Sequence, residues 1–354
     1  MVSCASSYIN PNTFWPVSFI GFAFPVVLVI NMVFLLGWAL IRHWLALVQL
    51  AAIALSWVCI YATFAFHFTA EQKDSGLKLM TWNVKNFDLY NWSHNTETRE
   101  KMMQLIAREK PDVLCLQEFY TNNQLFKNLA YIRDTLGYPY YYFFAGVNLS
   151  KLPKTKLQKT LWKSGLLNQQ WGVATFSKYP ITDSGKVEFK NAFANDCIYT
   201  DINFNGKTVR LYNVHFQSIH LGYDDYATID SIESSQKTTW VGLKNIIKKM
   251  KEGYARRSVQ AKAVAASMAT YGGGKILCGD FNDVPVSYTY RTVKQDLQDA
   301  FVERGSGFGP TYVNRFSIFR IDYTLLDSHI TINSYRTIKS NLSDHYPVCI
   351  TFDL

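Results

Sequence analysis

Two long apolar runs near the start of this 354-residue chain constrain its fold more than any other feature. The first covers residues 17–41 and the second covers residues 44–66, with only Arg42 and His43 between them. Each run exceeds the ~20 apolar residues that an α-helix needs to cross a bilayer. We therefore expect residues 1–66 to form a transmembrane hairpin, with helices at about 17–41 and 44–66, that binds the lipid bilayer. A pair of buried helices in a soluble protein is the alternative.

The basic residues at the hairpin tip indicate the orientation of the chain in the membrane. Arg42 and His43 are the basic residues at this tip, and basic loops tend to stay in the cytoplasm. This tendency places the rest of the chain on the non-cytoplasmic side of the cell (inner) membrane, as part of a multi-pass protein. Lys73 and Lys78 argue the other way.

A polar linker, residues 67–78, leads to residues 79–354, which have the composition of a globular domain. The formal net charge is +9, and the apolar hairpin contributes little of it. The excess favours an anionic partner such as nucleic acid, a phospholipid or a small phosphate ester, although solubility alone could explain it. No protein partner is predicted. No CxxC spacing occurs, so we do not expect a zinc site.

One segment of this domain is rich in basic residues. Residues 243–257 include Lys248, Lys249, Lys251 and Arg257. These side chains could form a surface that approaches an anionic bilayer or a polyanionic substrate. A solvated helix face is the alternative.

Short apolar runs bounded by polar turns recur along the domain, and amphipathic helical patterns at residues 96–110 and 234–270 lie between them. This mixture predicts an α/β or α+β domain with a large sheet core. Acids, amides and histidines stand where several strands end or begin. Each could be a turn, surface or core residue by itself, but together they form one chemical set: Asn83, Glu118, His215, Asp280, Asn282, Asp322, Asp344 and His345.

Carboxylates and amides are the ligands of a hard cation such as Mg²⁺ or Mn²⁺. Such a cation neutralises a phosphate ester and stabilises the leaving oxygen. A nearby carboxylate or histidine can activate the attacking water. The set therefore predicts hydrolysis of phosphate esters.

The motifs around these residues resemble those of the endonuclease/exonuclease/phosphatase superfamily, in the same order. They are TWNV (81–84), LCLQE (114–118), NVHF (213–216), GDFN (279–282), IDY (321–323) and SDHYPV (343–348). The resemblance covers about residues 79–354 and implies a DNase I-like α/β fold, a four-layer α/β/β/α sandwich. The apolar hairpin resembles that of a membrane-anchored bacterial subgroup of this superfamily.

The resemblance also implies a metal site. Glu118 would be the main ligand of Mg²⁺, or of Mn²⁺, and Asn83 would support it. Asp344 would be a second acid on the metal side. Lys85 departs from the pattern of the apurinic endonucleases, which carry an acid two residues after the motif asparagine.

The remaining residues would carry the reaction. Asp280 would position or deprotonate the attacking water, and Asn282 would hold the phosphate or the nucleophile. His345 would contact the phosphate, with Asp322 fixing its ring. His215 would donate to the phosphate or the leaving group. The sequence shows no clear acid to orient His215.

These features predict a membrane-anchored, divalent-metal-dependent phosphodiesterase, similar to a nuclease or a sphingomyelinase. A phosphomonoesterase of the same fold and a non-catalytic, membrane-tethered binding module remain the alternatives.

Overall fold

The computed structural model describes residues 1–67, 75–122, 124–148, 169–189, 195–219, 240–313 and 318–354. The chain forms two compact units. The N-terminal unit consists of Met1–Thr63, Gln217–Lys262 and Asn282–Val293. The sheet unit consists of Phe64–Phe216, Ala263–Phe281 and Lys294–Leu354.

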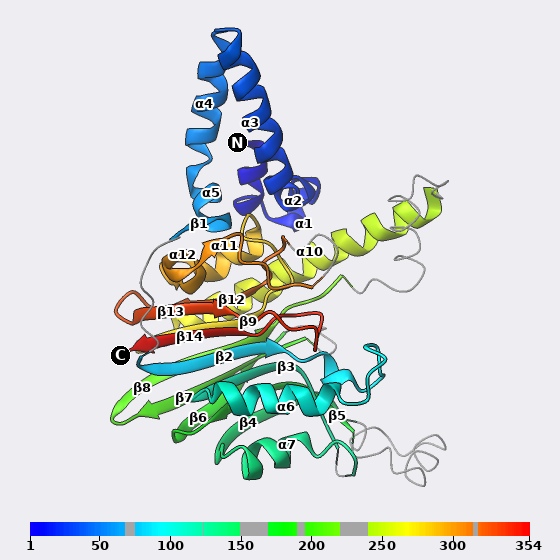
Figure 1. The fold of residues 1–354 in the computed structure, drawn as a ribbon, viewed down its shortest axis with the longest axis vertical. Helices are drawn as coiled ribbons and strands as arrows, with labels where there is room; N and C mark the ends of the chain where they lie inside the picture. Colours follow the sequence, from blue (N-terminus) through cyan, green and yellow to red (C-terminus); the bar gives the residue numbers. More distant parts are fainter. Residues whose placement is uncertain (68–74, 123, 149–168, 190–194, 220–239, 314–317) are drawn as a thin grey trace. The chain divides into compact units, whose positions relative to one another are not determined.

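The sheet unit contains two mixed six-stranded sheets (Figure 1). In spatial order the first sheet has β13 (Thr331–Thr337), β14 (Val348–Asp353), β2 (Leu77–Asn83), β3 (Val113–Thr121), β5 (Gln170–Ser177) and β4 (Tyr140–Asn148). The second has β10 (Gln298–Asp299), β12 (Asp322–Leu326), β9 (Gly274–Asp280), β8 (Lys207–His215), β7 (Asp196–Phe204) and β6 (Ile181–Val187). Strands β2 and β3 are parallel, as are β8 and β9, and the other pairs are antiparallel.

The two sheets pack face to face through one apolar cluster. Leu79 and Cys115 of the first sheet belong to it, together with Leu211 and Cys278 of the second. Side chains alternate between the faces of a strand, so the neighbouring residues point to the outer faces. This arrangement confirms the predicted DNase I-like α/β fold with a large sheet core.

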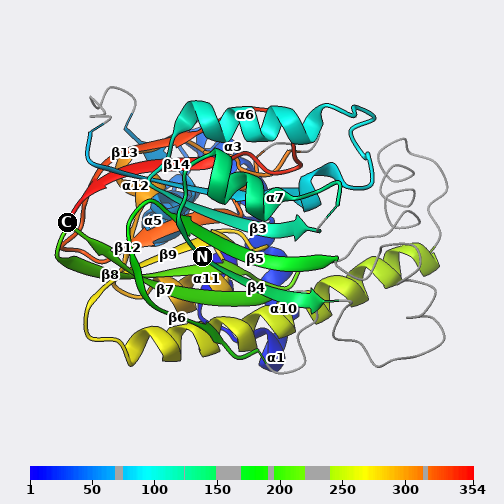
Figure 2. The same ribbon diagram turned by 90° about the horizontal axis from the view of Figure 1, so that it is seen from below.

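Helix α6 (Thr98–Glu109) covers the outer face of the first sheet (Figure 2). Its Met102 and Ile106 pack with Trp82 and Leu116 in one apolar cluster. This helix confirms the pattern read at residues 96–110. The other helical elements assigned wholly to this unit are η2 (Lys85–Asp88), α7 (Asn128–Ala130), η3 (Tyr131–Thr135) and α12 (Ala300–Arg304). A two-stranded sheet pairs β1 (Ala65–Phe66) with β11 (Ser306–Gly307).

The N-terminal unit is helical. Its elements are η1 (Val2–Ser7), α1 (Pro11–Phe14), α2 (Pro16–Phe22), α3 (Phe24–Leu40), α4 (Leu45–Leu55), α5 (Trp57–Thr63), most of α10 (Trp240–Ala269) and nearly all of α11 (Tyr288–Lys294). Neither predicted hairpin helix is continuous: α2 and α3 meet at a 66° bend, and α4 and α5 meet at a 58° bend. Within the described ranges no single helix is long and apolar enough to cross a membrane, whereas the two bent pairs meet that test by length and composition only.

Local chemistry explains these breaks. Pro25 lies in the first turn of α3, where it lacks an N–H and its ring would clash with the Gly21 carbonyl of a continuous helix. The hydroxyl of Ser56 donates to the Ala52 carbonyl, a local bond that bends helices. The second helix ends at Thr63 rather than at the predicted residue 66 because the next residues form β1.

The apolar surface of this hairpin is unusual for a protein in water. Val33, Leu36 and Leu47 have exposed fractions of 64%, 64% and 70%. A disulfide joins Cys4 of η1 to Cys59 of α5, with 6.1 Å between the two Cα atoms. This bond closes the two ends of the helical segment onto each other.

The basic segment lies on α10. Lys251 sits over the Trp15 ring, 5.6 Å from its centroid, and the Asn12 amide donates to the Ser258 hydroxyl at 2.7 Å. Arg257 is an exception to the predicted basic surface because it is buried. Its Nε lies 3.1 Å from an Asp283 carboxylate oxygen, so Arg257 is a structural residue.

Candidate active site

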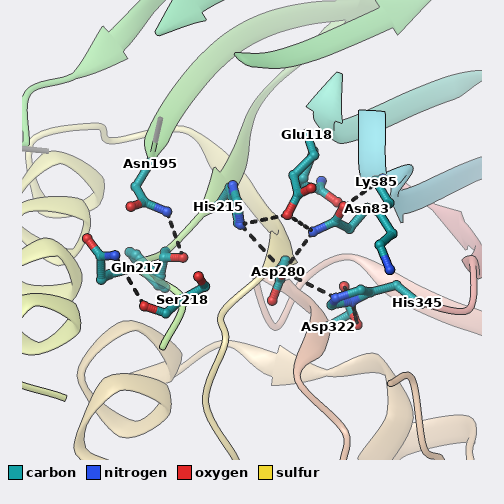
Figure 3. A network of polar contacts seen from close by, with 12 residues as sticks. Asn83, Lys85, Glu118, Asn195, His215, Gln217, Ser218, Asp280, Asp322 and His345 are labelled. Atoms are coloured by element: carbon teal, nitrogen blue, oxygen red, sulfur yellow. Dashed lines mark hydrogen bonds and ion pairs between the residues drawn. The ribbon is translucent and has the colours of Figure 1, made fainter. Parts of the chain in front are cut away.

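Strand register gathers the predicted polar residues of the sheet unit at one edge of the sheets, where the strands end. His215 ends β8 and lies opposite Asp280, which ends the parallel neighbour β9. Asp322 begins the antiparallel neighbour β12 and also lies opposite Asp280. Asn83 ends β2 in the other sheet. These strand ends explain why residues far apart in the sequence lie together (Figure 3).

Two irregular backbone positions shape this edge. The pairing of β3 with β5 shifts between Leu116 and Phe119, and Glu118 within this bulge has a φ of 48°. A bulge re-aims a side chain, and positive φ at a non-glycine residue stores strain that concentrates at functional sites. Gly279 has a φ of 133°, and a Cβ there would lie 2.0 Å from the Val214 carbonyl oxygen. Only glycine lets β9 approach β8 this closely.

The Asn83 amide links two of the carboxylates. Its Nδ2 donates to Glu118 Oε1 at 3.2 Å and to Asp280 Oδ2 at 3.0 Å. Its Oδ1 accepts the backbone N–H of Lys85 at 3.0 Å, which fixes the orientation of the amide. His215 Nε2 lies 3.7 Å from the same oxygens of Glu118 and Asp280. Four predicted residues therefore form one cluster.

His345 completes the cluster. Its Nδ1 lies 2.9 Å from Asp322 Oδ2, and its Nε2 lies 3.7 Å from Asp280 Oδ2. The Trp82 indole donates to the His345 carbonyl and fixes its backbone. Burial by itself would lower the pKa of His345, but the charges of Asp322 and Asp280 raise it well above its usual value. The two carboxylates therefore favour the protonated form of the ring.

Asp344 and Asn282 are placed differently from these residues. Asp344 Oδ2 lies 2.9 Å from Lys85 Nζ. Burial raises the pKa of Asp344, but the charges of His345 and Lys85 outweigh it and hold that pKa below its usual value. Asn282 has a φ of 52°, a conformation that asparagine tolerates. It belongs to the N-terminal unit, so its role in the site stays a prediction.

The structure supplies an acid near His215 that the sequence does not reveal. Asp196 begins β7 and is the register partner of His215. Burial raises the pKa of Asp196 to about 6, and the charge of His215 acts in the opposite direction. No motif surrounds Asp196, but the hairpin pairing of β7 with β8 could have located it.

Buried amides also connect the two sheets. Gln117 Nε2 on β3 donates to Asn213 Oδ1 on β8 at 2.6 Å and to the Thr81 hydroxyl on β2 at 3.0 Å. These bonds tie β3 to β8 and β2, although Gln117 Oε1 has no hydrogen-bond partner among the described residues. Gln117 and Asn213 stand within two predicted motifs, yet their bridging role emerges only from the packing.

The donor set fits a divalent cation. Ligand atoms of Asp280, Asp322 and His345 all lie within 4.8 Å of one another. The Glu118 carboxylate, with a side-chain exposed fraction of 32%, opens to solvent beside them. His215 Nε2 is buried without a hydrogen-bond partner in the described structure. Such a buried atom is satisfied by a ligand or water, and the oxygen-rich set suits a hard cation.

Two packed mixed sheets with this acid, amide and histidine edge define an enzyme of the DNase I-like fold class. The chain belongs to the Endonuclease/Exonuclease/phosphatase family, whose model matches residues 80–345. It is a hydrolase of phosphate esters. A domain of unknown function, DUF8431, matches residues 1–63.

Similarity to known proteins supports membership of this family. A phospholipase C of Staphylococcus aureus is 31% identical over 162 residues, which cover 42% of this chain and 46% of that protein. The chain thus spans just under half the length of this curated relative. An endonuclease/exonuclease/phosphatase structure from Beutenbergia cavernae has a TM-score of 0.54 at 17% identity and covers 78% of this chain and 71% of that one. A mannosyl-6-phosphatase of Bacteroides thetaiotaomicron has a TM-score of 0.53 at 15% identity, with coverages of 79% and 100%.

Proposed function

We propose that the chain is a divalent-metal-dependent phosphodiesterase of the phospholipase C type, which hydrolyses the headgroup ester of a phospholipid such as sphingomyelin. The convergence of Asn83, Glu118, His215, Asp280 and His345 on one edge carries this proposal. The likeness to the staphylococcal phospholipase C supports the lipid substrate.

The metal would be Mg²⁺, or Mn²⁺, held by Glu118 with support from Asn83. It would supply charge neutralisation at the phosphate and at the departing oxygen. Glu118 suits this role because its carboxylate is partly exposed and its backbone is held in an unusual conformation. The Asn83 amide holds the carboxylates of Glu118 and Asp280 in a fixed relation.

The other residues would move protons and bind the phosphate. Asp280 would orient and deprotonate the attacking water. The protonated ring of His345, fixed by Asp322, would donate from Nε2 to a phosphoryl oxygen. His215 would donate to the phosphate or to the leaving oxygen, with Asp196 as its register partner on β7. Asn282 would hold the phosphate or the nucleophile.

We also propose that the N-terminal hairpin holds the enzyme at a bilayer. Large exposed apolar patches on a helix pair mark a membrane or an interaction surface, and α3 and α4 carry such residues along their length. The Cys4–Cys59 disulfide favours an oxidising, extracytoplasmic compartment for this end of the hairpin. Both inferences agree with a cell-membrane enzyme that works on the non-cytoplasmic side.

A substrate panel tests this function. The full chain, purified in detergent with Mg²⁺, would be given sphingomyelin vesicles, bis-p-nitrophenyl phosphate, p-nitrophenyl phosphate and DNA. We expect release of the phosphorylated headgroup from the vesicles, and loss of that release in E118A and H345A. His329→Gln is the matched control because His329 is exposed and lies outside the cluster.

The remaining outcomes separate the alternatives. Cleavage of DNA, or of p-nitrophenyl phosphate alone, would replace the lipid substrate by a nuclease or a phosphomonoesterase. A wild-type chain that is inert on the whole panel with both Mg²⁺ and Mn²⁺ would favour a binding module and overturn the proposal.

A further inference from the structure

Lys85 stands at a position fixed by unusual backbone. It follows β2 by two residues and begins η2, where Lys85, Asn86, Phe87 and Asp88 have φ values of 43°, 55°, 54° and 56°. Four consecutive non-glycine residues in this region are costly, and such strain persists where the surrounding structure demands it. The backbone N–H of Lys85 is bonded to Asn83 Oδ1, so Lys85 is tied directly to the active-site amide.

The Lys85 side chain is held from two sides. Its Nζ lies 2.9 Å from Asp344 Oδ2 and 5.0 Å from the centroid of the Trp92 ring. The Trp92 ring in turn contacts the Tyr90 ring, with 4.9 Å between the centroids. A carboxylate and an aromatic face both attract an ammonium group. In Figure 3 the side chain extends from beside Asn83 toward His345.

The pairing of Lys85 bears on the metal site because the motif places Asp344 on the metal side. The Lys85 ammonium lies 2.9 Å from Asp344 Oδ2, so a divalent ion bound by Asp344 would have to displace it. A carboxylate already paired with a cation is a poor ligand for a second ion, because like charges repel at this distance.

We propose that the Lys85 ammonium is a resident cation of the phosphate site, which neutralises Asp344 and limits the site to one divalent ion. This inference rests on the metal site of the proposed function and defines its stoichiometry. Asp344 then pairs with Lys85 instead of binding metal. Trp92 acts as a positioning residue that keeps the ammonium beside Asp344.

Mn²⁺ binding tests the proposal without reference to catalysis. The full chain in detergent would be titrated with Mn²⁺ by calorimetry, and the bound ions would be examined by electron paramagnetic resonance. We expect one Mn²⁺ per wild-type chain and an uncoupled spectrum. Lys85→Asp should bind a second Mn²⁺, at least tenfold more tightly than any further ion binds to the wild type, with the spectrum of a coupled pair. K85D/D344N should return to one ion.

Two further variants keep the test decisive if K85D does not fold. Asp344→Asn should still bind one Mn²⁺, because the proposal removes Asp344 from the ligand set. Lys178→Met is the matched control, since Lys178 forms a similarly exposed pair with Asp112 at 3.3 Å, and it should also bind one.

Other results of the same Mn²⁺ titrations would overturn the proposal. Two ions bound to the wild type would refute the role of Lys85, as would loss of the ion in D344N or a single ion in folded K85D. No ion bound to the wild type would refute the metal site itself, and with it the proposed function. A wild type that binds one ion but fails the lipid assay would refute only the lipid substrate.

Discussion

Apolar side chains are usually buried and charged side chains are usually exposed. The two regions of this molecule depart from this rule in opposite directions. The helical hairpin exposes large apolar side chains such as Leu36 and Leu47, whereas the sheet unit buries charged ones such as Asp280 and His345. Exposed apolar surface costs free energy in water, and so does a buried charge. Under the proposed function, each cost is offset by a partner: a bilayer surrounds the hairpin, and a cation and a phosphate bind at the strand ends.

Removing Glu118 or His345 should have the largest effect, because it should abolish activity and leave membrane binding unchanged. E118A and H345A should each lower kcat/KM for bis-p-nitrophenyl phosphate by about 10³-fold or more, because charge stabilisation and proton donation are lost. Their partitioning onto vesicles should equal that of the wild type. An activity loss under tenfold in either variant would remove that residue from the catalytic group.

Lysines placed on the hairpin should weaken membrane binding and leave catalysis unchanged. V33K/L36K should lower vesicle partitioning by about 10²-fold or more, since a lysine in a spanning helix costs roughly 2.5–3.5 kcal/mol. Hydrolysis of the small diester should not change. Leu125→Lys is the control, because Leu125 is exposed on the sheet unit. Equal partitioning of V33K/L36K and the wild type would show that the hairpin meets something other than lipid.

The charge of Asp196 should lower the stability of the folded chain and raise its activity. Its pKa of about 6 lies above the ~3.9 of an unfolded aspartate, so ionising it destabilises the fold as pH rises from about 4 to 6. D196N should therefore be more stable than the wild type at pH 7.5, by on the order of 1–3 kcal/mol, and equal to it near pH 3.5. Urea unfolding of the metal-free chain at both values measures this difference.

The same variant should lose activity. His215 would lose the acid beside it, so kcat/KM should fall while the fold becomes more stable. A D196N variant with unchanged activity across the pH range would separate Asp196 from His215, and one that is less stable at pH 7.5 would contradict the cost of its burial.

The basic helix should give the smallest effect. Lys248→Met should weaken partitioning onto anionic vesicles about fivefold, as expected for ~1 kcal/mol per lysine near an anionic surface. Partitioning onto neutral vesicles should not change. The same loss on both kinds of vesicle would exclude an electrostatic contribution of Lys248.

The sequence indicates the two sheets and most of the polar cluster because strand ends carry their polar residues in a fixed order. His215 and Asp280 meet through the register of β8 and β9, whereas Asn83 reaches Asp280 across the packed sheets. Asp196 could not be located by motif, because it joins the site only through the β7–β8 pairing. The bulge at Glu118 likewise depends on how β3 meets β5.

Other features were beyond the sequence for a different reason. Composition shows that residues 17–41 and 44–66 are apolar, but it cannot distinguish a straight helix from a bent one. Arg257 looked like part of a basic surface because the sequence does not show that Asp283 lies against it. Lys85 was visible as a departure from a motif, yet its pairing with Asp344 requires the fold.

Anomalous diffraction would show whether one divalent cation sits among the polar strand ends. Crystals of the full chain would be soaked in Mn²⁺, and the metal would be located from its anomalous signal. We expect a single strong peak about 2.1 Å from a Glu118 carboxylate oxygen, close to the distance of a small hard cation. A map with no peak at Glu118, or with its main peak elsewhere in the molecule, would refute the metal site.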